Sequence, residues 1–165
     1  EEANSITKKA TARGTDFHEA AQAYLENRDL VWEDYLPATK FMFHHAAPYL
    51  DKINNIHAIE RTLYSEYLGL AGRVDCIAEY DKKLSVIDFK TATRKRDEKN
   101  ENYLVQASFY SIAWEERTGE KINQIAILTT TEDGELDVYR DDPSNYVGRL
   151  EEMIEEYKTG KIGDQ

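Results

Sequence analysis

The sequence predicts an α/β fold in which a mixed central β-sheet of about five strands is flanked by helices. Apolar residues recur at helical spacing near both ends of the chain and once in its middle, and short runs with strand-like alternation lie between them. The 165 residues, of which 41% are hydrophobic, suffice for a single domain with one sizeable core. We expect this domain to span residues 1–165 and to lack an upstream segment, because the chain starts at Glu1 with a helical pattern under way.

The first third of the chain is predicted to form two helices. Residues 10–28 form the first, because their apolar side chains share one stripe: Phe17, Ala20, Ala21, Tyr24 and Leu25. The second starts within residues 34–37 and stops at Asn54-Asn55. Pro48 is expected to interrupt or kink it, because proline has no backbone N–H.

Three strands are predicted next, at residues 56–67, 70–80 and 84–91. The last two are separated only by the polar turn at residues 81–83, so they form a β-hairpin. Asp75 and Asp88 then lie on adjacent strands near the same end. Because side chains alternate along a strand, Asp88 and Lys90 project from one face.

The remaining elements are a helix, two strands and a last helix. The charged stretch 93–102 has no apolar periodicity and is predicted to be a mobile basic loop or the frayed start of a helix. Residues 103–117 form a helix that Gly119 ends. Strands follow at 122–131 and 136–139, joined by the turn at 132–135, and residues 142–144 open an amphipathic helix.

Composition restricts the class of protein. The single cysteine, Cys76, excludes an internal disulfide and a site built from several thiolates, including an iron–sulfur cluster, and favours an intracellular, reducing compartment, cytoplasmic if the source is bacterial or phage. Apolar runs fall short of the roughly 18 residues of a membrane span, so no membrane partner is expected. The net charge of −11 argues superficially against nucleic acid, yet two local basic groups stand out: Lys8, Lys9 and Arg13, and Arg94, Lys95, Arg96 and Lys99.

Asp75, Asp88 and Lys90 are the first candidates for chemistry. Carboxylates on a half-buried strand need a partner, and oxygen ligands suit Mg²⁺ or Mn²⁺. With one or two such ions bound, Lys90 could orient or deprotonate an attacking water and stabilise charge on a phosphoryl group. The alternative roles are solubility for the aspartates and an ion pair for the lysine.

At this point the chain resembles a RecB-like nuclease of the PD-(D/E)XK superfamily, close to the phage-type and mitochondrial genome-maintenance exonucleases. The family pattern is a helix histidine, a strand glutamate, G-x-x-D, D/E-x-K and Q-x-x-x-Y in that order. The matching residues are Gly14 to His18, Glu60, Gly72 to Asp75, Asp88 to Thr91, and Gln106 to Tyr110. The resemblance covers residues 9–114 and implies a restriction-endonuclease-like core with metal-dependent DNA exonuclease activity.

The resemblance implies roles for single residues. The metal ligands would be His18, Asp75, Asp88 and the backbone carbonyl of Phe89, with Lys90 as the catalytic lysine. Glu60 would assist a second metal through water or hold Lys90 in place, although Glu66 is a nearby competitor. By itself a lone helical histidine is more often a surface or core residue, so His18 depends on the resemblance.

Several residues would contact the substrate, each with a structural alternative. Gln106 and Tyr110 share a helix face and would lie beside the cleft, or Tyr110 would extend a core stripe. Thr91 would bond a phosphate oxygen or the neighbouring backbone. The remaining candidates are the cations Arg13, Arg94, Lys95 and Arg96, which otherwise are solvated surface charges.

The implied partners are DNA, as a single strand or a duplex end, and a recombination or annealing protein. Three other activities stay open: an endonuclease of the same superfamily, a nucleic-acid-binding module that keeps the fold without turnover, and a hydrolase of small phosphoesters. Intact Asp75, Asp88 and Lys90 argue against the second. The preference for exonuclease activity is an analogy with the family.

Overall fold

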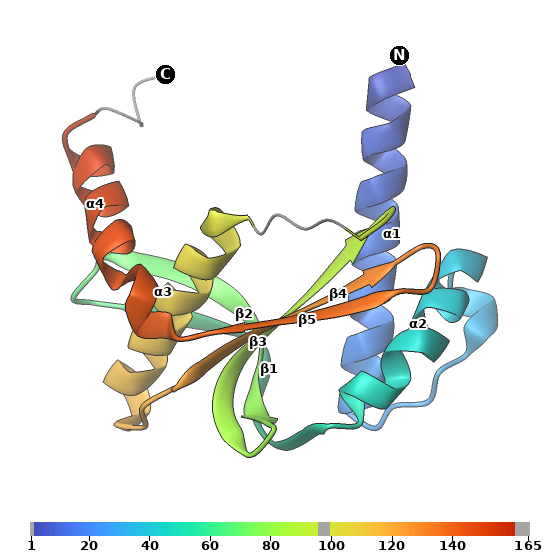
Figure 1. Cartoon of the computed structure of the whole chain (residues 1–165), viewed down its shortest axis with the longest axis horizontal. Coiled ribbons are helices and arrows are strands. Elements are labelled where there is room, and N and C mark those ends of the chain that lie inside the picture. Colours follow the sequence, from blue (N-terminus) through green and yellow to red (C-terminus); the bar gives the residue numbers. More distant parts are fainter. Residues whose placement is uncertain (1, 96–99, 161–165) are drawn as a thin grey trace.

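The computed structural model describes residues 2–95 and 100–160 and contains one five-stranded sheet between two layers of helices (Figure 1). The sheet order is β1-β2-β3-β4-β5. The elements are α1 (Glu2–Leu25), α2 (Pro37–Leu50), β1 (Ile53–Ser65), β2 (Leu70–Tyr80), β3 (Lys83–Ala92), α3 (Glu101–Thr118), β4 (Gln124–Thr131), β5 (Leu136–Asp141) and α4 (Val147–Lys158), with 3₁₀ turns at Trp32–Asp34 and Pro143–Tyr146.

The strand pairing confirms the predicted mixed sheet. β1, β2 and β3 form an antiparallel meander, and β4 and β5 form a second antiparallel pair. β3 and β4 run parallel, because α3 carries the chain back across the sheet between them. The β2–β3 hairpin and the order of helices and strands are as predicted.

Each face of the sheet has its own core. The α1 and α2 side chains, among them Phe17, Met42 and Phe43, pack with Cys76, Ile87 and Phe89 of the sheet. The α3 and α4 side chains, among them Leu104, Trp114 and Leu150, pack with Val74, Val86 and Ile127 on the opposite face. Successive residues of β3 therefore enter different cores, as the strand period requires.

The first helix is longer than predicted, because it begins at Glu2 rather than residue 10 and ends at Leu25. Residues 2–9 are exposed, so this extension has no apolar stripe that periodicity could detect. The Thr7 and Thr11 hydroxyls donate to carbonyls four residues earlier. These extra turns project beyond the sheet, and the middle of α1 lies alongside the end of β3, where Arg13 donates to Thr91 (Figure 1).

The predicted end of the second helix is wrong. α2 ends at Leu50, and Pro48 lies in its last turn without interrupting it. Asn54-Asn55 does not stop a helix but lies in β1, where the register shifts and Asn55 has a φ of 47°. The start of α2 is capped from outside, because the Asp16 carboxylate accepts from Leu36 N–H and Thr39 Oγ1.

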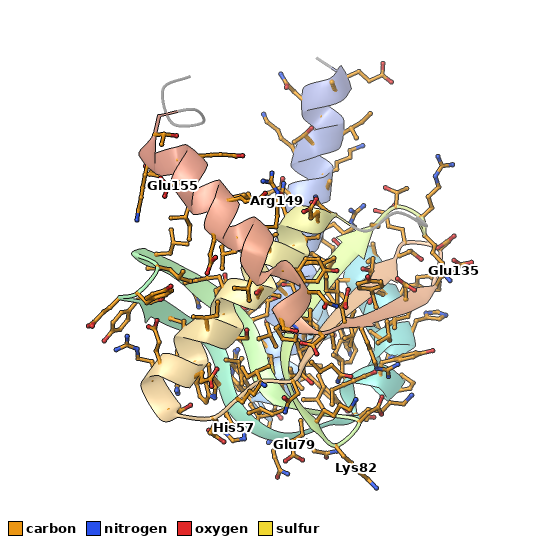
Figure 2. All side chains as sticks on the ribbon, turned by 60° about the vertical axis from the view of Figure 1, so that its left-hand side comes forward. His57, Glu79, Lys82, Glu135, Arg149 and Glu155 are labelled. Atoms are coloured by element: carbon orange, nitrogen blue, oxygen red, sulfur yellow. The ribbon has the colours of Figure 1, made fainter. Side chains whose placement is uncertain are left out.

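The α3 and α4 pair closes the other face. Asn100 caps α3 by accepting from Asn102 N–H, and Gly119 ends it with a φ of 77°, as predicted. Arg149, which is labelled on α4 in Figure 2, forms ion pairs with Glu101 of α3 and with Glu152 and Glu156 of its own helix. Within the described residues, the structure contains no helix with the length and apolarity of a membrane span.

Candidate active site

The sheet opens between β2 and β3 at the two predicted aspartates. The ladder of paired residues ends at Cys76 and Ile87, directly before Asp75 on one strand and Asp88 on the other. In the opening, the Asp75 carboxylate accepts a hydrogen bond from the Phe89 backbone N–H at 2.9 Å. The two aspartates therefore lie side by side near the same end of the hairpin, as predicted.

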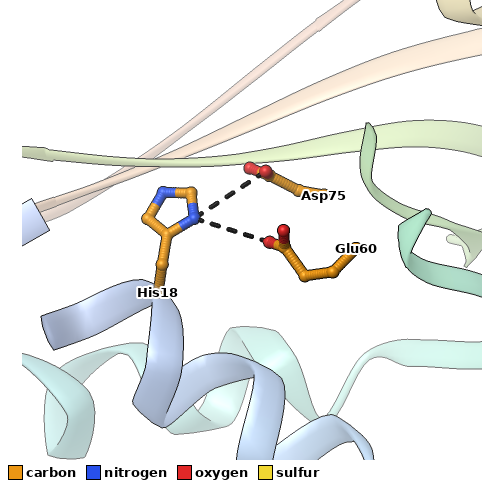
Figure 3. A group of neighbouring side chains, drawn as sticks. All are labelled: His18, Glu60 and Asp75. Carbon is orange, nitrogen blue, oxygen red and sulfur yellow. Dashed lines mark ion pairs between the residues drawn. The ribbon is translucent and has the colours of Figure 1, made fainter. Parts of the chain in front are cut away.

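His18 of α1 faces Glu60 of β1 and Asp75 of β2 (Figure 3). Its Nδ1 lies 3.7 Å from Asp75 Oδ1 and 3.9 Å from Glu60 Oε1. The other ring nitrogen, Nε2, contacts the Phe89 carbonyl oxygen, which can only accept, so Nε2 carries the proton. A neutral His18 consequently presents the Nδ1 lone pair to the two acids.

Glu60 adopts a backbone conformation that is rare in a strand. Its φ is 48°, in the left-handed region, although the register of β1 with β2 is the same on both sides of it. Such a conformation costs an L-residue other than glycine roughly 1–2 kcal/mol and clusters at functional sites. The strained backbone lies opposite Asp75 in the register and supports a carboxylate that lines the cleft.

This strain is testable through stability. We expect the free energy of unfolding of Glu60→Gly to exceed that of Glu60→Ala by about 1 kcal/mol, because glycine adopts a positive φ freely. In a urea titration, Glu60→Gly should therefore unfold at the higher urea concentration. Both variants lose the same carboxylate. At Thr62, which has no positive φ, glycine should be the less stable of the two replacements. The same order at both positions would contradict the strained backbone.

The carboxylates differ in charge compensation. Arg73 Nε lies 2.9 Å from Glu60 Oε2, and Lys90 Nζ lies 3.1 Å from Asp88 Oδ2. Asp75 faces His18, Glu60 and Asp88, and its side chain is 14% exposed. Burial, and then the adjacent Asp88 carboxyl, raise the pKa of Asp75 well above its ordinary value.

The donor set fits a divalent cation. One ligand atom each from His18, Glu60 and Asp75 lies within 4.8 Å of the others, and Asp88 adjoins Asp75. Nitrogen and carboxylate oxygen ligands suit Mn²⁺, and carboxylates suit Mg²⁺. A cation here would relieve the repulsion among the acids. The fold thus assembles the charge pattern of a metal site from α1, β1, β2 and β3.

Lys90 is held between an acid and an aromatic ring. Its ammonium contacts Asp88 and lies 3.9 Å from the centre of the Tyr103 ring at the start of α3. The side chain also lines an open cleft of about 530 Å³ together with His18, Glu60 and Asp75. Lys90 therefore faces the space that a phosphodiester next to these acids would occupy.

The Gln106 and Tyr110 pair supports the strand that carries Asp75. Tyr110 donates its hydroxyl to the Arg73 carbonyl at 2.8 Å, and burial raises the pKa of its phenol to about 12, so it stays a donor. Gly72 permits this approach, since a Cβ there would lie 3.1 Å from Tyr110 Oη. Gln106 is exposed beside Tyr110 and hydrogen-bonds to it.

The predicted substrate cations fall into two groups. Arg13 is tied to the fold, because it pairs with Glu132 at 2.9 Å and donates to the Thr91 and Thr93 hydroxyls. Arg94 and Lys95 are exposed at the end of β3. Arg96 lies outside the described residues.

Sequence reasoning gave no role to two residues that shape the site. Arg73 stands inside the Gly72-to-Asp75 motif, where it neutralises Glu60 and lines the cleft. Tyr103 is predicted only as the first residue of a helix, yet its ring contacts Lys90. The charge of Arg73 could have indicated its role, because residues two apart on a strand face the same side and Arg73 therefore points with Asp75. No such local signal exists for Tyr103, whose position depends on how α3 crosses the sheet.

Comparisons with known proteins agree with this geometry. A family model described as the PD-(D/E)XK nuclease superfamily matches residues 2–159. The human and mouse proteins named mitochondrial genome maintenance exonuclease 1 are each 30% identical over 91 residues. That alignment covers 54% of this chain but only 26% of the human protein and 27% of the mouse protein.

Among solved structures, a candidate exonuclease from Eubacterium rectale superposes with a TM-score of 0.57 at 14% identity. The superposition covers 91% of this chain and 69% of that one, which supports the restriction-endonuclease-like fold. Since the family model spans nearly the whole length and the five-stranded mixed sheet agrees with it, this chain belongs to the PD-(D/E)XK nuclease superfamily.

Proposed function

We propose that this chain is a divalent-metal-dependent deoxyribonuclease that hydrolyses phosphodiester bonds from DNA ends. The observation that supports the proposal best is the cluster of His18, Glu60 and Asp75 in an open cleft that Lys90 also lines. Hydrolysis of a phosphodiester needs charge stabilisation at the phosphate and an oriented water. This cleft offers residues for both.

The proposed metal-holding residues are His18, Glu60, Asp75 and Asp88, with Mg²⁺ or Mn²⁺ as one or two ions. When bound, such an ion would polarise the phosphate and lower the pKa of a coordinated water. The Phe89 carbonyl accepts from His18 Nε2, on the other side of the ring from Nδ1, so it would hold a second ion rather than the one that Nδ1 faces. That contact fixes the histidine ring so that Nδ1 faces the acids.

Lys90 is the proposed catalytic residue. Asp88 and the Tyr103 ring restrict its ammonium from two sides, so little side-chain freedom has to be lost when substrate binds. From this position it would orient the attacking water and stabilise charge on the phosphoryl oxygens. Thr91, which lines the same cleft, offers a hydroxyl to a phosphate oxygen.

DNA and an exonucleolytic mode are proposed by analogy with the relatives. Mitochondrial genome maintenance exonuclease 1 is by its name an exonuclease of mitochondrial genome maintenance. Arg94 and Lys95, which follow Lys90 closely in the chain, and the amide of Gln106 beside Tyr110 are exposed and suit contacts with a phosphate backbone. The acidic surplus of the chain then belongs to surfaces that do not touch the strand.

Digestion of end-labelled linear DNA and closed-circular DNA tests the proposal. We expect the linear substrate to shorten from its ends in Mg²⁺ or Mn²⁺, the circle to persist, and EDTA to stop the reaction, because the acids then lack the cation. Failure to cut either DNA with both metals would overturn the nuclease proposal. Cleavage of circles would overturn only the exonucleolytic mode, and cleavage in EDTA would overturn the metal dependence.

A further inference from the structure

A second cavity lies directly beside the active-site cleft. It has a volume of about 410 Å³ and opens between the first turns of α1, the end of β3 and the start of α3. Lys90 and Thr91 line both this cavity and the cleft, so the two spaces meet at the catalytic lysine. A strand whose phosphate occupies the cleft would therefore continue into the second cavity.

The walls of the second cavity combine three chemistries. Apolar side chains come from Ile6, Ala10 and Ile127. A hydroxyl comes from the half-buried Thr129 of β4, whereas the Thr131 hydroxyl two residues on is buried and bonded to Asp133 and Glu135 in the β4–β5 turn. An aromatic ring comes from Tyr103, which lies in the first turn of α3 and is 38% exposed.

Charge is distributed unevenly along the same walls. Arg94 and Lys95 are exposed at the rim, whereas Arg13 is occupied by its ion pair with Glu132. Asp137 lies opposite Thr129 in the β4–β5 register and contributes a carboxylate to the cavity. An anionic group would thus settle at the Arg94 and Lys95 end, and a neutral aromatic group would settle against Ile6, Ala10 and Tyr103.

These properties match one nucleotide, which has a flat apolar base, a polar sugar and one negative phosphate. The cavity volume also lies in the range of about 300–1,000 Å³ typical of small-ligand sites. We propose that the second cavity binds one unpaired nucleotide of the DNA strand, adjacent to the phosphate in the cleft. The inference rests on the proposed nuclease function and adds a substrate class, since only a single strand or a frayed end can insert a base without its partner.

A cavity-filling variant tests this binding site. We expect Ala10→Tyr to weaken binding of a fluorescein-labelled single-stranded oligothymidylate of about twelve nucleotides at least tenfold, because one stacked base contributes this much. Binding is measured by anisotropy in Ca²⁺, without turnover. Ala12→Tyr makes the same change at an exposed position on the same helix that lines neither cavity, and it should bind like the wild type.

A charge variant covers the case in which tyrosine disturbs α1. Ile6 is 62% exposed, so Ile6→Asp leaves the core intact while placing an anion in the cavity. We expect it to weaken oligothymidylate binding several-fold relative to Ser5→Asp, its neighbour outside the cavity. A blunt hairpin duplex should compete at least about tenfold less well than the single strand, since its bases stay paired.

The outcomes separate the two proposals. Equal binding by Ala10→Tyr and Ala12→Tyr, and by Ile6→Asp and Ser5→Asp, would overturn the nucleotide site while leaving metal-dependent cleavage unaffected. Equal competition by the duplex would overturn the preference for a single strand. Loss of binding only in the two cavity variants would support the site, even if the wild type proved unable to cleave DNA.

Discussion

Lys90→Ala is expected to lower the rate of DNA cleavage by about 10²–10⁴-fold, the range that a positioned proton-transfer or charge-stabilising group contributes. The variant should keep its fold, because the Lys90 ammonium lies at the cleft rather than in either core. It should also keep cation binding, since the change removes a positive charge beside Asp88. Single-turnover cleavage measures the first effect, and the rise in melting temperature with Mn²⁺ measures the second.

Lys83→Ala is the matched control for Lys90→Ala. Lys83 begins the same strand, is exposed and lies at the end of β3 away from the cleft. It should cleave DNA at the wild-type rate. Cleavage by Lys90→Ala within a few-fold of wild type would remove the lysine from the mechanism, whereas loss of the Mn²⁺-induced stabilisation would assign it to metal binding instead.

The sheet and its hairpin were predictable because their signals are local. Alternation over residues 70–80 and 84–91, with a three-residue polar turn between, leaves one antiparallel pairing in which Asp75 and Asp88 adjoin. The helix ends were less predictable. The first turns of α1 have no apolar stripe, and the cap of α2 is the side chain of Asp16 from another helix.

The site was only partly predictable for a related reason. Asp75, Asp88 and Lys90 share one hairpin, so strand geometry alone brings them together. His18 and Glu60 come from other elements, and only the family resemblance pointed to them. No local pattern signals the left-handed backbone of Glu60, since the residues that favour it are glycine and asparagine. The second cavity likewise depends on tertiary packing, because α1, β3, β4 and α3 all contribute to it.

Asp75→Asn is expected to abolish cleavage and, at the same time, to stabilise the metal-free protein at neutral pH by about 2 kcal/mol, or roughly 4–8 °C. Burial and the neighbouring Asp88 raise the pKa of Asp75 in the folded state above its value in the unfolded chain. Folding therefore takes up a proton between the two pKa values, and the free energy of unfolding falls as pH rises through that window. Asparagine cannot ionise, so its advantage should grow with pH.

With a metal bound, the wild type should become more stable than Asp75→Asn, and this change in the order of stability is the decisive measurement. Melting temperatures in EDTA and in Mn²⁺ across pH 5–9 should show the wild type gaining stability with Mn²⁺, increasingly so at higher pH, because the cation replaces the proton on Asp75. Asp75→Asn should gain little. Asp81→Asn, an exposed aspartate in the β2–β3 turn that pairs with Arg140, should follow the wild type in both conditions. If Asp75→Asn instead proved less stable than the wild type in EDTA at pH 8, the buried Asp75 carboxylate would not destabilise the metal-free protein. The physical argument for a cation at this position would then fail.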